Sequence, residues 1–432
     1  MSGTSRTAEL RQLAARDLPA AEAALEAFIG GLFDLKVEGL RINVDQYSLN
    51  SLNGTFTAAD QGYFFKFHQE EGEEEMRGEY YRAEILAKAG LPVDRPLYMS
   101  RLPGEQVLVY AKRDDRRFSD VLFDLDLAPD AQAAARCVAA EATLNDHLLQ
   151  VAEETLKPIT PEMSEAEPIH RLFHERLIDP AQGQYPGGRL KRFYVDKVFR
   201  FPDDDGVFDL DWSALSTARP VLNGIAYADT LGELFDRAYR RCAPAALADA
   251  GGTVAHGDAH NANVWYEHGT DQDRLSLFDP AFAGDAVPSL LAEVKSTFHN
   301  VFAHPFWLYN PEIAEQRYKA QVRYDGTRLF IDTDWQPNPL RRALLEAKQV
   351  HFWAPWIARL RDEGLLPEDW EDVIRLGLFM SPTLVMNLNA GEGADRHNAT
   401  SSAIGLMVAL MVGSRPLEAE DICSRFFAGI RG

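Results

Sequence analysis

The sequence predicts an α+β protein with two lobes, a small antiparallel sheet followed by a large, mainly helical lobe. Strand-like aromatic and apolar runs gather between residues 46 and 111, and helical periodicity dominates after a polar segment at 112–117. A chain of 432 residues is long enough for two or three subdomains that share a cleft. We divide it into an N-terminal helical extension (1–40), an N-terminal lobe of sheet plus helix (41–113) and a helical C-terminal lobe (114–432).

The first elements follow from local patterns. Residues 5–35 alternate alanine and leucine with charged residues at helical spacing, and Pro19 predicts a break between two helical pieces. Three short strands, DQYSL, NSLNG and TFTAAD, then lead to a longer strand, QGYFFKFH, which ends at His68. An acidic helix is expected over QEEGEEEMRGEYYRAEILAKAG, and it ends at Gly90.

Two further strands are predicted in PLYMSRLPGEQVLVYAKRDD, around a turn at Pro103 and Gly104. The polar segment from Lys112 to Arg117 is the expected hinge between the lobes. Beyond it the pattern is mostly helical, with one extended excursion at about 185–225 that turns at 203–206.

Composition and charge exclude several classes of function. The formal charge of −22 would repel a nucleic-acid backbone. Cys137, Cys242 and Cys423 form no CxxC pair, so neither a zinc site nor a redox centre is expected. The polar N-terminus lacks a signal peptide, and the best apolar run, Ala403–Val412, is too short for a bilayer and predicts a buried helix. We expect a cytoplasmic monomer or homodimer that binds neither nucleic acid nor membrane.

The segment TVAHGDAHNANVWYEHGTDQDRLSLFDPAFAGD, residues 253–285, carries the strongest chemical signal. Two short strands around a turn near Gly269 are expected to bring Asp258, Asn263 and Asp279 to one edge. Phosphoryl transfer needs a carboxylate that orients and deprotonates the nucleophile, and hard oxygen ligands that hold Mg²⁺ on the phosphates. These three side chains can supply both.

Its HGDAHNAN run resembles the HGDxHxxN catalytic loop of the aminoglycoside phosphotransferase and choline kinase group, the small-molecule branch of the protein-kinase-like fold. The resemblance implies Asp258 as catalytic base, Asn263 and Asp279 as metal ligands, and Mg²⁺ and ATP or GTP as cofactors. It also implies transfer of the γ-phosphoryl group to a hydroxyl of a small substrate such as an aminoglycoside, a sugar or an amino alcohol. Two positions depart from the pattern: Gly257 replaces a regulatory arginine of protein kinases, and Ser289 replaces a second aspartate.

The same resemblance implies a phosphate-binding lysine in the sheet. Lys66 is a charge among apolar aromatic residues of the strand QGYFFKFH, and it occupies that place. Glu79 on the following helix is then its ion-pair partner, with Glu84 as the fallback. The alternative interpretation is a strand-edge lysine beside a surface glutamate.

The sequence contains no GxGxxG loop to cover the phosphates. SLNSLNGTF reads as the turn between the first two strands, so Ser51, Asn53 and Gly54 are candidates to donate hydrogen bonds there. Asn-Gly is equally an ordinary hairpin turn, and that alternative stays open. The resemblance places the adenine against the backbone around Val109, Tyr110 and Ala111.

Two other functions stay open. His256, Asp258 and His260 form an HxDxH pattern that could bind a transition metal in a hydrolase. The second alternative is a kinase-like scaffold that catalyses no reaction.

In the helical lobe, the aromatic clusters at 305–311 and 351–356 either line a substrate pocket or pack in the core. Asp285, Glu293 and the carboxylates of EDWEDV either contact an aminated substrate or lie on the surface.

Overall fold

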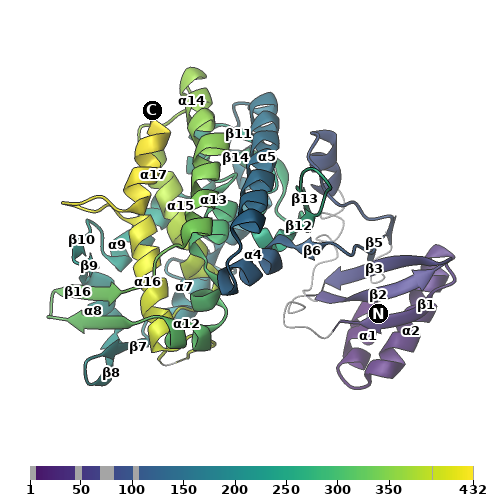
Figure 1. Ribbon diagram of the computed structural model, residues 1–432, viewed down its shortest axis with the longest axis horizontal. Coiled ribbons are helices and arrows are strands. Elements are labelled where there is room, and N and C mark those ends of the chain that lie inside the picture. Colours follow the sequence, from purple (N-terminus) through teal and green to yellow (C-terminus); the bar gives the residue numbers. More distant parts are fainter. Residues whose placement is uncertain (1–5, 44–50, 69–81, 101–106, 392, 432) are drawn as a thin grey trace.

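The computed structural model describes residues 6–43, 51–68, 82–100, 107–391 and 393–431. A small sheet lobe, built from the N-terminal residues, lies beside a large helical lobe (Figure 1). The predicted fold class, α+β with a small antiparallel sheet and a mainly helical second lobe, is confirmed.

The N-terminal lobe contains an antiparallel sheet of five strands in the order β1-β2-β3-β5-β4. The strands are β1 (Glu38–Ile42), β2 (Ser51–Ala58), β3 (Gln61–His68), β4 (Tyr98–Met99) and β5 (Leu108–Ala111). Helices α1 (Arg6–Ala14) and α2 (Leu18–Phe33) share the core of this sheet through Leu10, Leu25 and Ile29. The helices are therefore part of this lobe, and the predicted boundary at residue 40 falls inside β1.

Local sequence explains where α2 and the central hairpin begin. Asp17 caps α2 by accepting a hydrogen bond from the Ala20 amide, and Pro19 lies in the first turn, as the predicted break requires. β2 and β3 pair along their whole length and are joined by Ala59 and Asp60. The φ angles of these two residues, 49° and 62°, suit a tight two-residue hairpin turn.

The structure corrects the strand pattern in front of this hairpin. The predicted strand DQYSL lies outside the described residues, whereas β1 lies further toward the N-terminus, in a stretch with no predicted strand. NSLNG and TFTAAD do not form two strands, because residues 51–58 form the single strand β2. The turn predicted at Ser51–Gly54 is therefore wrong. Gly54 permits close packing, since a Cβ there would lie 2.1 Å from the Arg41 carbonyl oxygen and 2.7 Å from the Phe65 ring.

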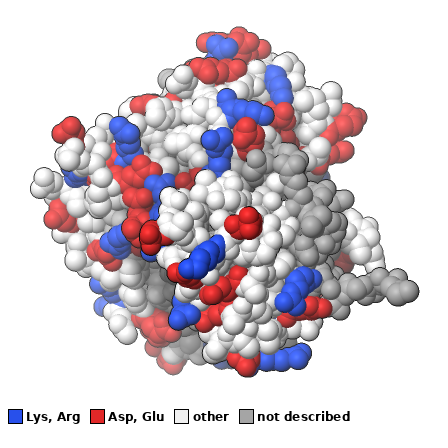
Figure 2. Space-filling view, turned by 90° about the vertical axis from the view of Figure 1, so that its right-hand side faces the viewer, with Lys and Arg blue, Asp and Glu red and all other residues white. Residues whose placement is uncertain are grey.

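The remaining N-terminal elements agree with the expectations where they are described. The acidic helix is seen over 82–88 and ends before Gly90, which has a left-handed φ of 95°. β4 and β5 pair antiparallel, as predicted, and the turn at 103–104 lies outside the described residues. Figure 2 views the molecule from the side of this lobe and shows acidic and basic side chains interspersed on that face.

The C-terminal lobe is mainly helical. Its longer helices are α4 (Phe118–Leu127), α5 (Ala131–Thr155), α9 (Leu231–Arg241), α13 (Pro339–Lys348), α14 (Ala354–Asp362), α15 (Trp370–Val385), α16 (Ala399–Gly413) and α17 (Ile422–Arg431). The shorter ones are α6 (Pro161–Glu165), α7 (Gly188–Phe193), α8 (Trp212–Thr217), α10 (Val294–Thr297), α11 (Pro305–Leu308) and α12 (Pro311–Arg317). Along α16 almost every residue is buried, which confirms the buried helix predicted at Ala403–Val412. None of the helices that the structure describes has the length and apolar character needed to cross a bilayer.

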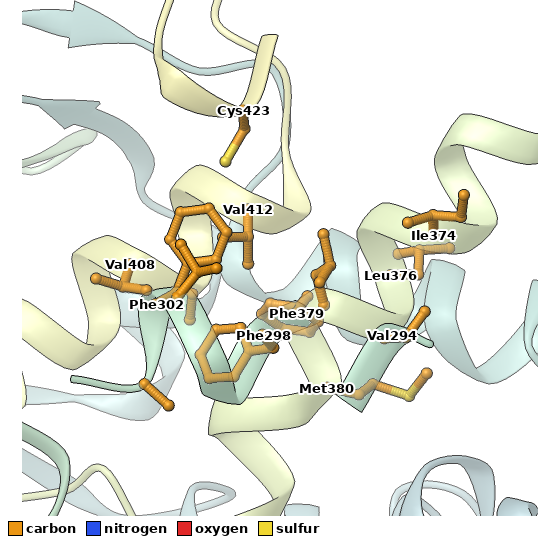
Figure 3. Packing of buried hydrophobic residues seen from close by; sticks show 14 of the residues in the cluster. Val294, Phe298, Phe302, Ile374, Leu376, Phe379, Met380, Val408, Val412 and Cys423 are labelled. Atoms are coloured by element: carbon orange, nitrogen blue, oxygen red, sulfur yellow. The ribbon is translucent and has the colours of Figure 1, made fainter. Parts of the chain in front are cut away.

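One hydrophobic core fills this lobe. Figure 3 shows Val294, Phe298 and Phe302 beside residues of α15 and α16. The aromatic clusters belong to this core: Trp353 and Trp356 are fully buried, and their indole nitrogens donate to the Thr297 hydroxyl and the Ser289 carbonyl. Of the two interpretations of these tryptophans, core packing is correct.

The helical lobe also contains several short antiparallel or mixed sheets. The predicted excursion forms the hairpin of β7 (Val198–Asp203) and β8 (Gly206–Asp211), and it turns where the sequence indicated. A sheet of β10 (Ile225–Ala226), β9 (Arg219–Leu222), β16 (Arg328–Thr333) and β15 (Ala320–Tyr324) was not predicted. Near the hinge lie β6 (Arg116–Arg117), β12 (Val264–Glu267) and β13 (Arg274–Leu277), while β11 (Gly252–Ala255) pairs with β14 (Gly284–Pro288).

All three cysteines are free and buried. Burial raises the pKa of Cys137 to about 11 and that of Cys242 to about 12, and it also raises the pKa of Cys423. The thiols therefore stay protonated at neutral pH.

Candidate active site

Two paired strands position the HGDAHNAN segment. This segment joins β11 to β12, and β12 pairs antiparallel with β13, which ends just before Phe278. The Phe278 amide donates to the Asn263 carbonyl oxygen at 3.0 Å. This pairing brings Asn263 and Asp279 to the same edge.

His256 connects the two loops that carry the candidate carboxylates. Its Nδ1 accepts a hydrogen bond from the Asp258 amide at 3.3 Å, so its Nε2 carries the hydrogen and donates to the Phe278 carbonyl at 2.9 Å. The ring is fully buried. Gly257, between His256 and Asp258, has a φ of 74°, and a Cβ there would lie 2.8 Å from the Phe282 carbonyl oxygen, so this position of the loop requires glycine.

Asp258 is buried, and its two carboxylate oxygens have different surroundings. Oδ2 lies 3.5 Å from the Asn263 amide nitrogen, which also donates to the Asp258 carbonyl oxygen at 3.0 Å. Oδ1 is buried and makes no hydrogen bond in the structure. A buried carboxylate oxygen without a partner is costly, so Oδ1 is a candidate position for a hydrogen bond from a ligand or a water molecule.

Lys66 joins the two lobes at this site. Its Nζ lies 2.7 Å from Asp279 Oδ1, although the two residues are 213 positions apart. Lys66 is buried within β3, where its strand partner is Asn53. Asp279 has a φ of 55°, an uncommon conformation for a residue other than glycine, and such strain is typical of functional sites.

The predicted glutamate partners of Lys66 have different outcomes. Glu79 lies outside the described residues. Glu84 does not serve as the fallback, because it faces Lys88 at 3.7 Å and Arg95 at 3.4 Å.

The other predicted nucleotide contacts lie in strands. Ser51 and Gly54 lie in β2 with Asn53, whose side-chain oxygen accepts a hydrogen bond from the Asn43 amide at 2.8 Å. Tyr110 and Ala111 form the end of β5, opposite Phe64 and Tyr63 of β3.

Sequence reasoning missed a group of basic side chains beyond Asp258. The group consists of Lys295 on α10, His299 on the π-helical turn that follows it, and Arg176 and Arg189. Lys295 Nζ lies 3.1 Å from His299 Nε2. These residues belong to no motif, and only the buried position of a lysine in an apolar stretch could have drawn attention to them.

The acidic candidates of the helical lobe have structural partners. Glu293 is neither a substrate contact nor a surface charge, since it is buried 2.9 Å from Lys348, which also lies 3.2 Å from Glu141. Asp285 is exposed, 3.7 Å from Lys157. Three of the four carboxylates of EDWEDV pair with arginines: Asp369 with Arg241, Glu371 with Arg375, Arg415 and Arg431, and Asp372 with Arg237 and Arg415. The fourth, Glu368, is exposed.

No family model matches the chain, and neither does any curated protein. Among solved structures, it is similar to a thermostable mutant of the aminoglycoside phosphotransferase APH(4)-Ia in its apo form, with 13% identity and a TM-score of 0.40 over 83% of this chain and 98% of that one. It is also similar to APH(3'')-Id from Streptomyces rimosus, with 16% identity and a TM-score of 0.34 over 69% and 90%. Spectinomycin phosphotransferase APH(9)-Ia, in complex with ADP and spectinomycin, shares 10% identity with a TM-score of 0.34 over 90% and 98%.

Proposed function

We propose that this chain is a small-molecule kinase that transfers the γ-phosphoryl group of ATP or GTP to a substrate hydroxyl, with Asp258 as the base. The observation that carries the proposal is the 2.7 Å ion pair between Lys66 and Asp279, next to the linked pair of Asp258 and Asn263. A lysine from a sheet, two carboxylates and an asparagine are the groups that phosphoryl transfer requires. Lys66 of the N-terminal sheet thus meets three polar side chains of residues 258–279.

Asp258 suits the role of base because its Oδ1 is buried and accepts no hydrogen bond from the residues that the structure describes. A substrate hydroxyl placed within hydrogen-bond distance of Oδ1 could donate its proton there during transfer. Two hydrogen bonds hold Asp258 in place: its backbone amide donates to His256 Nδ1, and its Oδ2 accepts from the Asn263 side chain.

Asp279 and Asn263 are suited to hold Mg²⁺, since this ion prefers oxygen ligands and is usually bound by one or two protein groups plus phosphates. In support, the Asn263 side chain uses its nitrogen toward Asp258, and its Oδ1 makes no hydrogen bond with any residue that the structure describes. When bound, Mg²⁺ neutralises charge on the transferring phosphates.

Lys66 would bind a phosphate oxygen in exchange for, or together with, Asp279. The adenine would lie against Ala111. Lys112 donates to the Gly62 carbonyl at 2.9 Å, and because hydrogen-bonded pairs alternate along an antiparallel ladder, the Ala111 amide and carbonyl point away from β3. This supports Ala111 as a hydrogen-bonding partner of a base.

The alternative of a metal-dependent hydrolase has less support. Both ring nitrogens of His256 already form hydrogen bonds, and His260 Nδ1 accepts one from the Ala262 amide at 3.2 Å. Within the described ranges, no three His, Cys, Asp or Glu side chains are placed to share a metal ion.

A thermal-shift titration with ATP and GTP, with and without Mg²⁺, tests the proposal. A ligand that binds only the native state at a hundred times its Kd stabilises the protein by about 2.7 kcal/mol. We expect a magnesium-dependent rise in Tm for the wild type and for the control Asp285→Asn, and its loss in Asp279→Asn. The absence of any shift with either nucleotide would favour the inactive scaffold.

A further inference from the structure

The two oxygens of Asp258 separate two neighbourhoods. Oδ2 faces Asn263, on the side where Asp279 and Lys66 would hold the nucleotide. Oδ1 faces His260, whose Nε2 lies 3.8 Å away. If Asp258 is the base, the side of Oδ1 is the side from which the acceptor hydroxyl approaches.

Beyond Oδ1, contacts between His260, His299 and Lys295 lead to the buried ammonium group of Lys295. The rings of His260 and His299 lie 5.0 Å apart between centroids, and His299 Nε2 lies 3.1 Å from Lys295 Nζ. Burial lowers the pKa of His299 well below its ordinary value, so this ring is neutral and accepts the hydrogen bond. Lys295 is 3% exposed, and no carboxylate of the described residues lies within 4 Å of it.

Two arginines extend the positive charge toward the surface. Arg176 and Arg189 are half-buried, and both donate to the Leu384 carbonyl oxygen, at 3.3 and 3.0 Å. The Arg176 guanidinium has five N–H donors, so its bond to Leu384 leaves others for a ligand. Burial, opposed by the attraction of Asp258 and reinforced by repulsion from the two arginines, lowers the pKa of Lys295 to about 7.

A second buried lysine, Lys348, has the carboxylate partners that Lys295 lacks. Lys348 is equally buried but lies 2.9 Å from Glu293 and 3.2 Å from Glu141. Burial lowers the pKa of Lys348, but the two glutamates outweigh it and raise the pKa. Lys66 likewise pairs with Asp279, so Lys295 is the exception among the buried lysines of the described residues.

We propose that the acceptor of this kinase is a hydroxyl compound with an anionic oxygen group, carboxylate or phosphate, which Lys295 and Arg176 bind beside Asp258. The inference rests on the proposed function and narrows its substrate. Guanidinium groups match the planar or tetrahedral oxygens of such anions, and a buried ammonium gains a counter-charge from them. A polycationic aminoglycoside or an amino alcohol would meet repulsion at the same place.

A purely structural role is the competing explanation for the arginines. Leu384 and Val385 lie at the end of α15, where basic side chains stabilise the free carbonyls of a helix. Helix capping does not explain Lys295, whose hydrogen bond goes to His299.

The test uses the full chain saturated with Mg²⁺ and the non-hydrolysable analogue AMP-PNP, so that the nucleotide site is filled. Inorganic phosphate, acetate and ethanolamine are titrated by calorimetry at constant ionic strength. The variants are Lys295→Met, which keeps the side-chain volume, Arg176→Gln and Arg176→Lys, with the exposed Lys191→Gln as the matched control. We expect phosphate or acetate to bind, with at least a tenfold loss in Lys295→Met and Arg176→Gln but not in Arg176→Lys or the control.

Melting temperatures separate ligand binding from structural support. Because a buried charge without a counter-charge costs stability, Lys295→Met should melt at or above the wild-type temperature while it loses the anion. A lower Tm together with lost binding, unchanged anion affinity in both variants, or tighter binding of ethanolamine than of either anion would overturn the inference. If AMP-PNP causes no magnesium-dependent shift, the proposed function itself fails. The tighter of the two anions identifies the group on the acceptor.

Discussion

Asp258 follows β11 and Asp285 lies in β14, the strand that pairs with β11, but the two carboxylates differ in burial and in hydrogen bonding. Asp258 is buried with one oxygen unpartnered, whereas Asp285 is exposed. Asp258→Asn keeps the size of the side chain and removes its ability to take a proton. We expect turnover to fall by at least about 100-fold, the low end of what a general base contributes, with nucleotide affinity unchanged.

This prediction is measured by the release of ADP or GDP in the presence of an acceptor, and by nucleotide-dependent Tm. Asp285→Asn serves as the control and should keep its turnover. A variant Asp258→Asn that retains most of its kcat would rule out the assignment of Asp258 as base.

The variant Gly54→Ala tests whether Gly54 is needed for close packing between strands. A Cβ at this position would meet the Arg41 carbonyl oxygen and the Phe65 ring, so Gly54→Ala should cost about 1–3 kcal/mol through overpacking. At Gly31, inside α2, a Cβ would meet nothing within 4 Å, and Gly31→Ala should instead stabilise by about 0.5–1 kcal/mol. Urea unfolding of both variants measures the difference. Equal stability of Gly54→Ala and wild type would contradict the packing argument.

Between elements, a buried ion pair fixes α4 to α13. Asp126 Oδ2 lies 2.6 Å from Arg341, whose guanidinium also donates to the Asn300 carbonyl oxygen at 2.8 Å. Asn300 in turn accepts a hydrogen bond from the Asn261 amide of the catalytic loop at 2.8 Å. The helix contact therefore supports the loop that carries Asp258.

Asp126→Asn would leave Arg341 buried without a counter-charge, which costs about 3–5 kcal/mol. Burial raises the pKa of Asp126, but His304 and Arg341 outweigh it and lower the pKa. A carboxylate with a lowered pKa stabilises the fold above its unfolded pKa of 3.8 and loses this contribution as pH falls further. The stability gap between wild type and variant should thus be constant near neutral pH and shrink below about pH 4.

Denaturant unfolding across this pH range measures the gap. Asp124→Asn, an exposed position on the same helix, should show almost no effect. A gap that widened as the pH fell would contradict the assigned direction.

The sequence predicted elements well where neighbours along the chain decide them. HGDAHNAN and the strand before Asp279 form one hairpin, so the spacing of Asp258, Asn263 and Asp279 already implied their proximity. The pairing of β15 and β16 was not predicted, although Asp325 and Gly326 lie in their turn. The surrounding residues have helical periodicity, which favoured helix over this whole region.

Tertiary packing decides the rest. The sequence predicts Glu293 at a substrate or on the surface. In the structure its carboxylate instead pairs with Lys348, more than 50 residues away, and is buried. Lys295 likewise has no local pattern that indicates a function. Its role depends on which buried groups surround it, and the spacing of residues along α10 does not encode them.

For the whole molecule, the contacts between the lobes are both apolar and polar. Leu86 and Leu91 pack in the core of the helical lobe, and Leu277 exchanges backbone hydrogen bonds with Pro92 and Asp94. Arg113 of the hinge lies 2.8 Å from Asp94 and 2.6 Å from Glu267, and its guanidinium lies 5.8 Å from the centre of the Trp265 ring. The five-stranded sheet with α1 and α2 has a hydrophobic core of its own, separate from that of the helical lobe. The stability of each lobe therefore depends in part on this hinge residue.

Arg113→Met should uncouple the unfolding of the two lobes. All seven tryptophans lie in the C-terminal lobe, so their fluorescence reports on that lobe, while far-UV circular dichroism reports on both. We expect the two thermal transitions to coincide in the wild type and to separate in the variant, because coincident probes are the mark of two-state unfolding. Arg95→Met, at an exposed ion pair, is the control, and coincident transitions in Arg113→Met would contradict the role of the hinge.

The burial of all three cysteines has a practical consequence for following motion between the lobes. Since the thiolate is the reactive form and burial keeps these thiols protonated, maleimide dyes should leave the native chain unlabelled. One cysteine introduced at Asp60, in the β2–β3 turn, and another at Asp204, in the β7–β8 turn, would then carry a donor and an acceptor fluorophore without removal of any natural residue elsewhere. Energy transfer between them would report in real time whether the lobes approach each other when nucleotide is added.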